Sequence, residues 1–273
     1  TLDGNVKDKF IQNFINNGIK HFRKLRQKPV NILGCYYWQM CSEKEALKQI
    51  IEIDDKLNTQ EEINNYMSKL PYRPFTKNEL QWRLFITVNN NNQTVVVLNW
   101  DHSLADGLGS AGLLLKLSDG FDIKKYPSLK KKTNSEKIFN LCMMPFFTFY
   151  VIYKLFFIRS GKGPFKTNKR TIDKKFITSK SFDFIPIRNV SKKLNVTFND
   201  YILHIITNAS KRYLKNNSFN QVNSISCLIP VNFRETPMSE EELVLNNESS
   251  GVSLKILFYD NEDKQLAEIK KTT

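Results

Sequence analysis

Two adjacent runs of strand-forming residues constrain the fold most strongly. Residues 82–88 read WRLFITV and residues 94–100 read TVVVLNW. Both are rich in β-branched and aromatic side chains, which fit a pleated, half-buried surface. Residues 89–93 between them read NNNNQ, a polar turn. The pattern predicts a β-hairpin whose second strand is the more buried one. An apolar helix is predicted from about residue 110, so the chain combines sheet and helix.

The rest of the chain alternates between helical and extended patterns. The clearest helix spans residues 198–214, where apolar residues recur at helical spacing. Thr59 and Glu62 form a capping-box pattern. Further predicted elements are helices at 10–27, 59–70 and 187–194, and strands at 46–53, 180–184, 224–231 and 251–258. With 273 residues, 41% of them apolar, the chain has enough apolar side chains for one large α/β domain or two smaller ones.

The strongest candidate site lies between the hairpin and the apolar helix. Residues 101–107 read DHSLADG, directly after a strand, where a rigid scaffold aims catalytic side chains. His102 is a candidate general base, because histidine titrates near neutral pH. Asp106 is placed to hold the loop, and Gly107 allows a positive φ or a close backbone approach. A structural or surface role for His102 is the alternative.

Several common catalytic classes lack their sequence signatures. The chain has no nucleophile elbow, no phosphate-binding P-loop and no GxGxxG fingerprint. We expect His21 to lie at the surface of a basic helix and His204 to be partly buried in the 198–214 helix. The four cysteines are Cys35, Cys41, Cys142 and Cys227. They form no CxxC pair, which favours a reducing compartment. Metal binding and a resident cofactor are therefore not expected.

Residues 99–107 resemble the HHxxxDG motif of the wax ester synthase/diacylglycerol acyltransferase family. More broadly, this motif marks the chloramphenicol acetyltransferase-like acyltransferases and condensation domains. Four more stretches resemble family segments in the family's order: 74–83 (PLD…PLWR), 196–214 (TVND…RRYL), 230–234 (PVNxR) and 247–251 (GN…G). The resemblance implies an α/β fold, a chloramphenicol acetyltransferase-like two-layer sandwich of mixed sheets with flanking helices.

The resemblance also implies a division of the chain into two half-domains. Residues 1–176 would form the N-terminal half, which carries the motif and a basic and apolar, membrane-associating insertion at 121–176. Residues 177–273 would be the start of the C-terminal half. Because family members generally continue well beyond this point, that half-domain is expected to be incomplete, and the chain to be a fragment.

The activity that the resemblance implies is direct acyl transfer. In the family, the second histidine of the motif removes the proton from an acceptor hydroxyl, which then attacks the thioester carbonyl of acyl-CoA. His102 occupies that position. The chain would be an O-acyltransferase that moves a fatty acyl group from acyl-CoA to a long-chain alcohol or to diacylglycerol, with no further cofactor.

Other positions of the motif segments have implied roles or depart from the family. Asp106 would be an architectural partner of the loop, and Asn199, Asp200 and Arg234 match segments near the substrate channel. Helix capping is the alternative for Asn199 and Asp200. Asp101 stands where the motif has its first histidine. The alternative function is therefore a catalytically inactive, membrane-associated, lipid-binding relative.

The basic charge of the chain is concentrated around one apolar segment. The formal net charge is +14, of which residues 121–180 contribute +12. Within that stretch residues 141–158 read LCMMPFFTFYVIYKLFFI. An interfacial helix fits this pattern best, because aromatic side chains prefer the membrane interface and lysines can snorkel. We expect the protein at the cytosolic face of a membrane, on the endoplasmic reticulum, a lipid droplet or the plasma membrane.

Three other interpretations of this segment stay open. One is a buried core helix between solvated basic loops, and another is a spanning helix, for which the segment is short. The third is nucleic-acid binding through basic clusters such as Lys130, Lys131 and Lys132. The basic residues enclose an apolar block without the aromatic pattern of RNA-binding modules, so we expect no nucleic acid.

Overall fold

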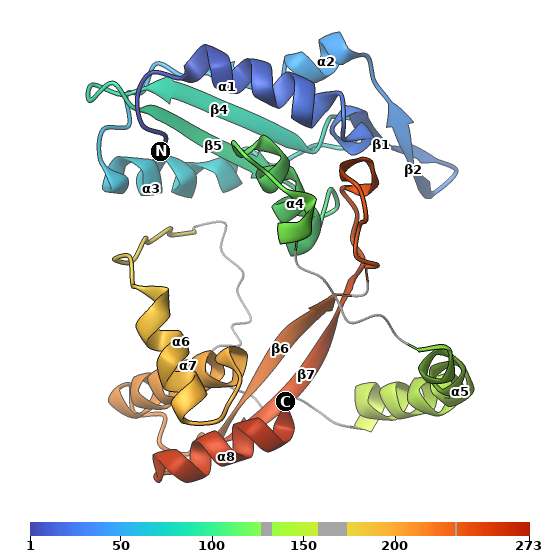
Figure 1. Ribbon diagram of the computed structural model, residues 1–273, viewed down its shortest axis with the longest axis vertical. Coiled ribbons are helices and arrows are strands. Elements are labelled where there is room, and N and C mark those ends of the chain that lie inside the picture. The colour runs from blue at the N-terminus through green and yellow to red at the C-terminus, as the bar shows by residue number, and fades with distance from the viewer. Residues whose placement is uncertain (127–132, 158–173, 233) are drawn as a thin grey trace. The chain divides into compact units, whose positions relative to one another are not determined.

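The computed structural model of the protein describes residues 1–126, 133–157, 174–232 and 234–273 (Figure 1). The described residues form two compact units. Unit 1 draws on residues 1–129, 171–179 and 232–249, and unit 2 on residues 130–170, 180–231 and 250–273. Each unit is therefore assembled from three separate stretches of the chain. The predicted half-domains, 1–176 and 177–273, stay a prediction.

Unit 1 is built on a mixed three-stranded sheet with the order β3-β4-β5. Its strands are β3 (Ile50–Glu52), β4 (Trp82–Val88) and β5 (Thr94–Trp100). β4 and β5 pair antiparallel, with Trp82 opposite Trp100, which confirms the hairpin. β3 runs parallel to β4. The prediction that the second strand is the more buried one is wrong, because β4 is the central strand and is covered more completely than β5.

Alternate side chains of β4 pack against helices on opposite faces of the sheet, as the strand period of two requires. On one face, the Trp82 ring lies 5.4 Å from the ring of Phe14, centroid to centroid. On the other face, Phe85 lies 5.7 Å from Tyr66. Phe14 belongs to the π-helical segment η1 (Phe14–Ile19), which continues α1 (Lys7–Asn13), and Tyr66 belongs to α3 (Gln60–Lys69). The main hydrophobic core, with Trp82 and Leu84, lies on the η1 face.

The remaining elements of unit 1 are η2 (Arg23–Arg26), β1 (Gln27–Ile32), β2 (Cys35–Met40), α2 (Glu43–Leu47), η3 (Leu70–Tyr72), α4 (Gly107–Leu117), η4 (Ile123–Lys125) and η5 (Glu240–Glu242). The helix predicted over 10–27 is thus interrupted, because the backbone becomes extended at Phe22 before η2. The strand predicted over 46–53 is wrong in its first half. There Ser42 caps α2 by accepting a hydrogen bond from the Glu45 N–H.

In unit 1, local backbone and side-chain features determine one hairpin turn and one helix cap. β1 and β2 form an antiparallel hairpin that the sequence pattern did not predict. Its turn has Leu33 and Gly34 at positive φ, the requirement of a two-residue hairpin loop. At α3, by contrast, Thr59 and Glu62 make both hydrogen bonds of the capping box, as predicted.

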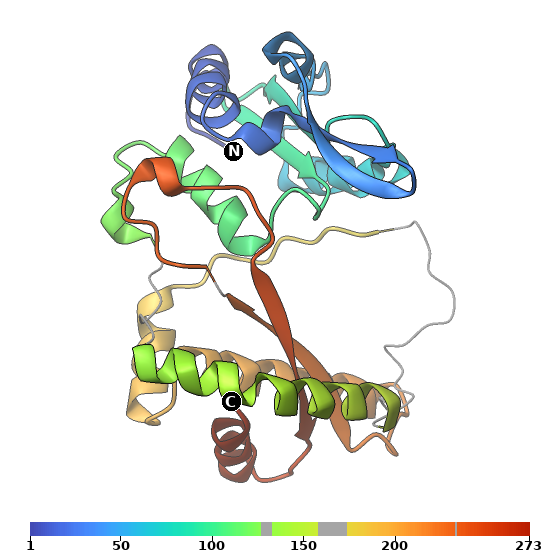
Figure 2. The same cartoon turned by 90° about the vertical axis from the view of Figure 1, so that its right-hand side faces the viewer.

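Unit 2 contains a two-stranded sheet and four helices among its described residues. β6 (Ser224–Asn232) and β7 (Ser249–Leu257) lie side by side in both views (Figures 1 and 2). The helices are α5 (Asn134–Phe157), α6 (Phe184–Lys193), α7 (Phe198–Asn216) and α8 (Glu262–Thr272). Leu203 of α7, Ile256 of β7 and Ile269 of α8 form a small buried core.

The predicted helix at 198–214 and strands at 224–231 and 251–258 are confirmed as α7, β6 and β7. The strand predicted over 180–184 is wrong. This stretch has no regular structure until Asp183 caps α6, accepting a hydrogen bond from the Ile185 N–H. Helix α6 contains most of the helix predicted at 187–194.

Residues 141–157 of the apolar segment are helical, as part of the longer helix α5, and residue 158 lies outside the described residues. Several basic residues that flank it in the sequence lie outside the described residues: Lys130, Lys131, Lys132, Arg159, Lys162 and Lys166. None of the described helices is long and apolar enough to cross a membrane.

Candidate active site

The DHSLADG motif forms a tight turn at the end of β5. The backbone N–H of Asp101 donates to the carbonyl of Gln81, which anchors the start of the turn. The Asp101 carboxylate accepts a hydrogen bond from the Ser103 N–H at 2.8 Å. His102 follows with an exposed side chain, while Leu104 and Ala105 point into the core. Asp101 therefore shapes the turn, and the turn presents the His102 imidazole to solvent.

Asp106 is buried and holds the end of this turn. Its Oδ1 caps α4 by accepting from the Gly109 N–H at 3.0 Å, and it also accepts from Arg234 at 2.6 Å. Its Oδ2 accepts from the Glu248 N–H at 2.8 Å. Burial by itself raises the pKa of Asp106, but the hydrogen bonds from Arg234, Gly109 and Glu248 outweigh it and lower the pKa to about 2. Asp106 is therefore ionised at neutral pH.

Arg234 joins the motif loop to a distant part of unit 1. Its side chain is only 7% exposed, and its guanidinium donates to Asp106 and to the carbonyl of Asn246. Arg234 is separated from Asp106 by 128 positions in the chain. Its Nε is buried and has no hydrogen-bond partner among the described residues. This buried ion pair is the charged centre of the candidate site.

Residues 234–248, which we call the strap, hold the motif loop through hydrogen bonds. Leu243 and Leu245 of the strap belong to the main core. Asn247 Nδ2 donates to the carbonyl of His102 at 2.9 Å, and the Asn246 carbonyl accepts from the Asp106 N–H at 3.3 Å. The strap therefore holds the backbone of His102 in place but makes no hydrogen bond to the His102 imidazole.

The glycine that another backbone segment approaches closely is Gly109, not Gly107. A Cβ on Gly109 would lie 3.1 Å from the carbonyl oxygen of Asn246 and 3.1 Å from the Cβ of Ala105. A Cβ on Gly107 would meet nothing within 4 Å, and Gly107 does not have a positive φ. The expectation for Gly107 is therefore wrong. The strap lies against the first turn of α4, where Gly109 is located, and no local sequence signal reveals that contact.

Asn199 and Asp200 belong to unit 2, at the start of α7. Thr197 and Asp200 form a reciprocal capping box. Asp200 also accepts a hydrogen bond from the Thr273 hydroxyl at 2.6 Å. Burial raises the pKa of Asp200, but the hydrogen bonds from Thr273 and Thr197 reverse that effect, so the pKa is lowered. Asp200 thus has the capping role that the sequence left open, whereas Asn199 has an exposed side chain.

The other two histidines are not part of this arrangement. His21 is half-buried rather than at the surface, because it lies in a turn after η1, where its ring packs edge-on against Phe22 at 4.6 Å. His204 is buried on α7, with its Nε2 3.1 Å from Asn208 Nδ2. No group of three or more histidine, cysteine or acidic side chains among the described residues could hold a metal ion.

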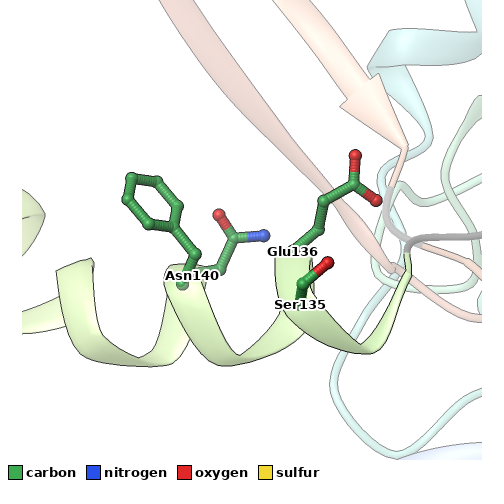
Figure 3. Close-up of a pocket in the computed structure, with 4 residues that line it drawn as sticks. Ser135, Glu136 and Asn140 are labelled. Carbon is green, nitrogen blue, oxygen red and sulfur yellow. The ribbon is translucent and has the colours of Figure 1, made fainter.

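A shallow pocket on α5 does not carry comparable chemistry. Figure 3 shows the side chains of Ser135, Glu136 and Asn140 along the first turns of this helix. The Glu136 carboxylate accepts hydrogen bonds from the backbone and hydroxyl of Thr133, at 2.7 and 3.1 Å. Glu136 therefore helps to cap the N-terminus of α5. The motif loop stays the best candidate site.

Comparison with known proteins adds the fold family. No family model and no curated protein matches the sequence. Among solved structures, the first condensation domain of the calcium-dependent antibiotic synthetase matches with a TM-score of 0.65 at 11% identity, over 99% of this chain and 66% of that domain. The epimerization domain from the third module of tyrocidine synthetase B matches with a TM-score of 0.58 at 12% identity, over 99% of this chain and 64% of that one.

The chain has a condensation-domain fold. A third match, to the condensation domain of the Monacolin K polyketide synthase MokA, has a TM-score of 0.55 at 10% identity and covers 97% of this chain and 63% of that one. Condensation domains are chloramphenicol acetyltransferase-like, so the predicted α/β fold class is confirmed. At these identities the likeness concerns the fold, and a fold alone does not determine chemistry. The chain spans somewhat less than two thirds of the length of these structures.

Proposed function

We propose that the protein is an acyl-CoA-dependent O-acyltransferase in which His102 is the general base. The observation that carries this proposal is the placement of His102. Its side chain is exposed at the end of β5, on a loop whose backbone is held by Asp106 and Asn247. A catalytic group on a fixed loop at a strand end is a common arrangement in enzymes. The acyltransferase-like fold supports the same reaction class.

In the proposed reaction, the His102 imidazole takes the proton of an acceptor hydroxyl as the oxygen attacks the thioester carbonyl. The tetrahedral intermediate then expels the CoA thiolate, which recovers the proton from the imidazolium. The products are an ester and free CoA, so the step needs no oxidant and no acyl-enzyme. General base catalysis of this kind contributes roughly 10²- to 10⁴-fold in rate. The acceptor that we propose is a long-chain alcohol or diacylglycerol.

Two charged residues of the other motif segments, Arg234 and Asp200, have positioning roles in this proposal. The Arg234 guanidinium is occupied by Asp106 and Asn246, so it holds the loop rather than contacting substrate. The Asp200 carboxylate likewise accepts hydrogen bonds from the Thr197 N–H and the Thr273 hydroxyl. Asn199, whose side chain is exposed, keeps the proposed place beside the substrate channel.

A lipid-binding relative without activity is the second candidate function. The observation in its favour concerns the orientation of the base: among the described residues, none makes a hydrogen bond to the His102 imidazole. The neighbouring Asp101 carboxylate is directed to the Ser103 N–H instead. In catalytic dyads and triads, by contrast, a third group commonly orients the base.

An acyl-transfer assay with the full chain separates the two candidates. The protein is incubated with radiolabelled palmitoyl-CoA and with hexadecanol or dioleoylglycerol, and both the labelled ester and the released CoA thiol are measured. The proposal expects ester and thiol in equal amounts with at least one acceptor. Thiol release without ester would indicate hydrolysis only. Absence of both products from folded protein would favour the inactive relative.

A further inference from the structure

Helix α5 exposes an aromatic stripe along one face. At 3.6 residues per turn, five of its aromatic residues fall within an arc of about 100°. All five have exposed side chains, from 53% to 70%. They are Phe139, Phe146, Phe149, Tyr150 and Tyr153. We call this set the aromatic face of α5.

The opposite face of α5 is more mixed in character. Asn140 and Thr148 lie there, between the apolar side chains of Leu141, Met144 and Val151. Leu141 is 66% exposed and Met144 is 59% exposed, values similar to those of the aromatic face. The two faces therefore differ in aromatic content and polarity but not in accessibility.

Exposed aromatic surface on this scale is unfavourable in water, and a contiguous patch of it marks an interaction site. The sequence around α5 indicates the sign of the partner, because residues 121–180 carry +12. No acidic or basic residue occurs between residues 138 and 153. An uncharged aromatic face flanked by basic sequence is complementary to a partner that has an apolar interior and a negatively charged surface.

We propose that the aromatic face of α5 binds the surface of an anionic phospholipid bilayer, with the helix lying in the interface. Phenylalanine and tyrosine rings favour the boundary between headgroups and acyl chains. Basic segments next to such a helix are attracted to anionic lipid, and salt weakens this attraction. The binding is independent of acyl transfer, so it holds for an active enzyme and for an inactive relative.

The test is flotation of the full chain with vesicles of phosphatidylcholine containing 30% phosphatidylserine, compared with pure phosphatidylcholine. The aromatic-face variant is Phe146→Ser with Phe149→Ser, and the matched control is Leu141→Ser with Met144→Ser on the opposite face. Circular dichroism and gel filtration establish that each protein is folded and report its oligomeric state. All substituted side chains are exposed, so the fold should be retained.

The proposal expects the wild type to float with anionic vesicles and less with neutral ones, and high salt to weaken the binding. The aromatic-face variant should bind about tenfold more weakly, whereas the control should change much less. Equal losses in both variants, or no flotation of the wild type, would overturn the proposal. A wild-type dimer that the aromatic-face variant abolishes, without vesicle binding, would identify the face as a protein interface and overturn it as well.

Discussion

Asp106 is a buried carboxylate paired with the buried guanidinium of Arg234. Replacing Asp106 by Asn leaves the Arg234 charge buried without its counter-ion. Breaking a buried pair in this way costs about 3–5 kcal/mol of unfolding free energy. Urea denaturation followed by circular dichroism measures the loss. Glu52→Gln, which breaks the exposed Lys7–Glu52 pair, is the control and should leave the unfolding free energy nearly unchanged. Similar losses for the two variants would contradict the structural role of the pair.

The same carboxylate predicts how stability depends on pH. The pKa of Asp106 is lowered from 3.8 to about 2 in the folded protein. A carboxyl with a lowered pKa stabilises the fold fully above its unfolded value and loses that contribution as the pH falls through its folded value. Asp106 therefore contributes about 2 kcal/mol that disappears between about pH 4 and pH 2.

Denaturation curves for the wild type and Asp106→Asn, recorded in steps from pH 6 to pH 2, test this contribution. The two proteins should differ most at pH 5–6, and the gap should narrow toward pH 2. Other carboxyls with a lowered pKa, such as Asp200, affect both proteins equally and cancel in the difference. A gap that stays constant across this range would show that ionisation of Asp106 is not what stabilises the loop.

At the scale of the elements, the first turn of α4 is set by its contact with the strap. Gly109→Ala places a methyl group 3.1 Å from the Asn246 carbonyl, so the strap must move or the helix must shift. Overpacking of this kind costs about 1–3 kcal/mol. Gly107→Ala meets open space and should be neutral or slightly stabilising, because alanine favours helix over glycine. Thermal unfolding of both variants provides the comparison, and a loss in Gly107→Ala equal to that in Gly109→Ala would refute the contact.

The capping box of α7 gives a prediction for unit 2. Thr197→Ala removes the side chain that accepts from the Asp200 N–H at 3.1 Å and should cost about 1 kcal/mol. Asn199→Ala, two positions along, changes an exposed side chain and should leave stability unchanged. Chemical denaturation of each variant measures both effects. If Asn199→Ala were the more destabilising change, the assignment of Asp200 to capping and of Asn199 to the surface would be wrong.

Elements with a strong local pattern were predictable from the sequence. The β4–β5 hairpin follows from two strand-forming runs separated by a polar turn, and the start of α3 follows from Thr59 and Glu62. The strand predicted over 46–53 failed because its first residues are capped into a helix by Ser42, a local hydrogen bond that outweighs the apolar pattern. The hairpin of β1 and β2 was missed because neither strand alternates cleanly between buried and exposed positions.

At the scale of the whole molecule, the site depends on contacts that sequence spacing does not reveal. His102, Asp106 and Arg234 could each be named from motif resemblance. The pairing of Asp106 with Arg234 and the bond from Asn247 to the His102 carbonyl join positions more than 120 residues apart. These contacts exist because the strap returns to unit 1 and buries Leu243 and Leu245 in its core. Only the folded chain shows that Arg234 holds the loop and that Gly109 lies beneath the strap.

In the proposed function, the loop between β5 and α4 presents His102 as the base of an acyl transfer. The most direct measurement is the rate of ester formation from palmitoyl-CoA by the wild type, His102→Ala and Ser103→Ala, on protein shown to be equally stable. His102→Ala is expected to lose about 10²- to 10⁴-fold in rate. Ser103→Ala, which alters the neighbouring exposed side chain of the same turn, should stay within about twofold of the wild type. Ester formation by His102→Ala at the wild-type rate would show that His102 is not the base.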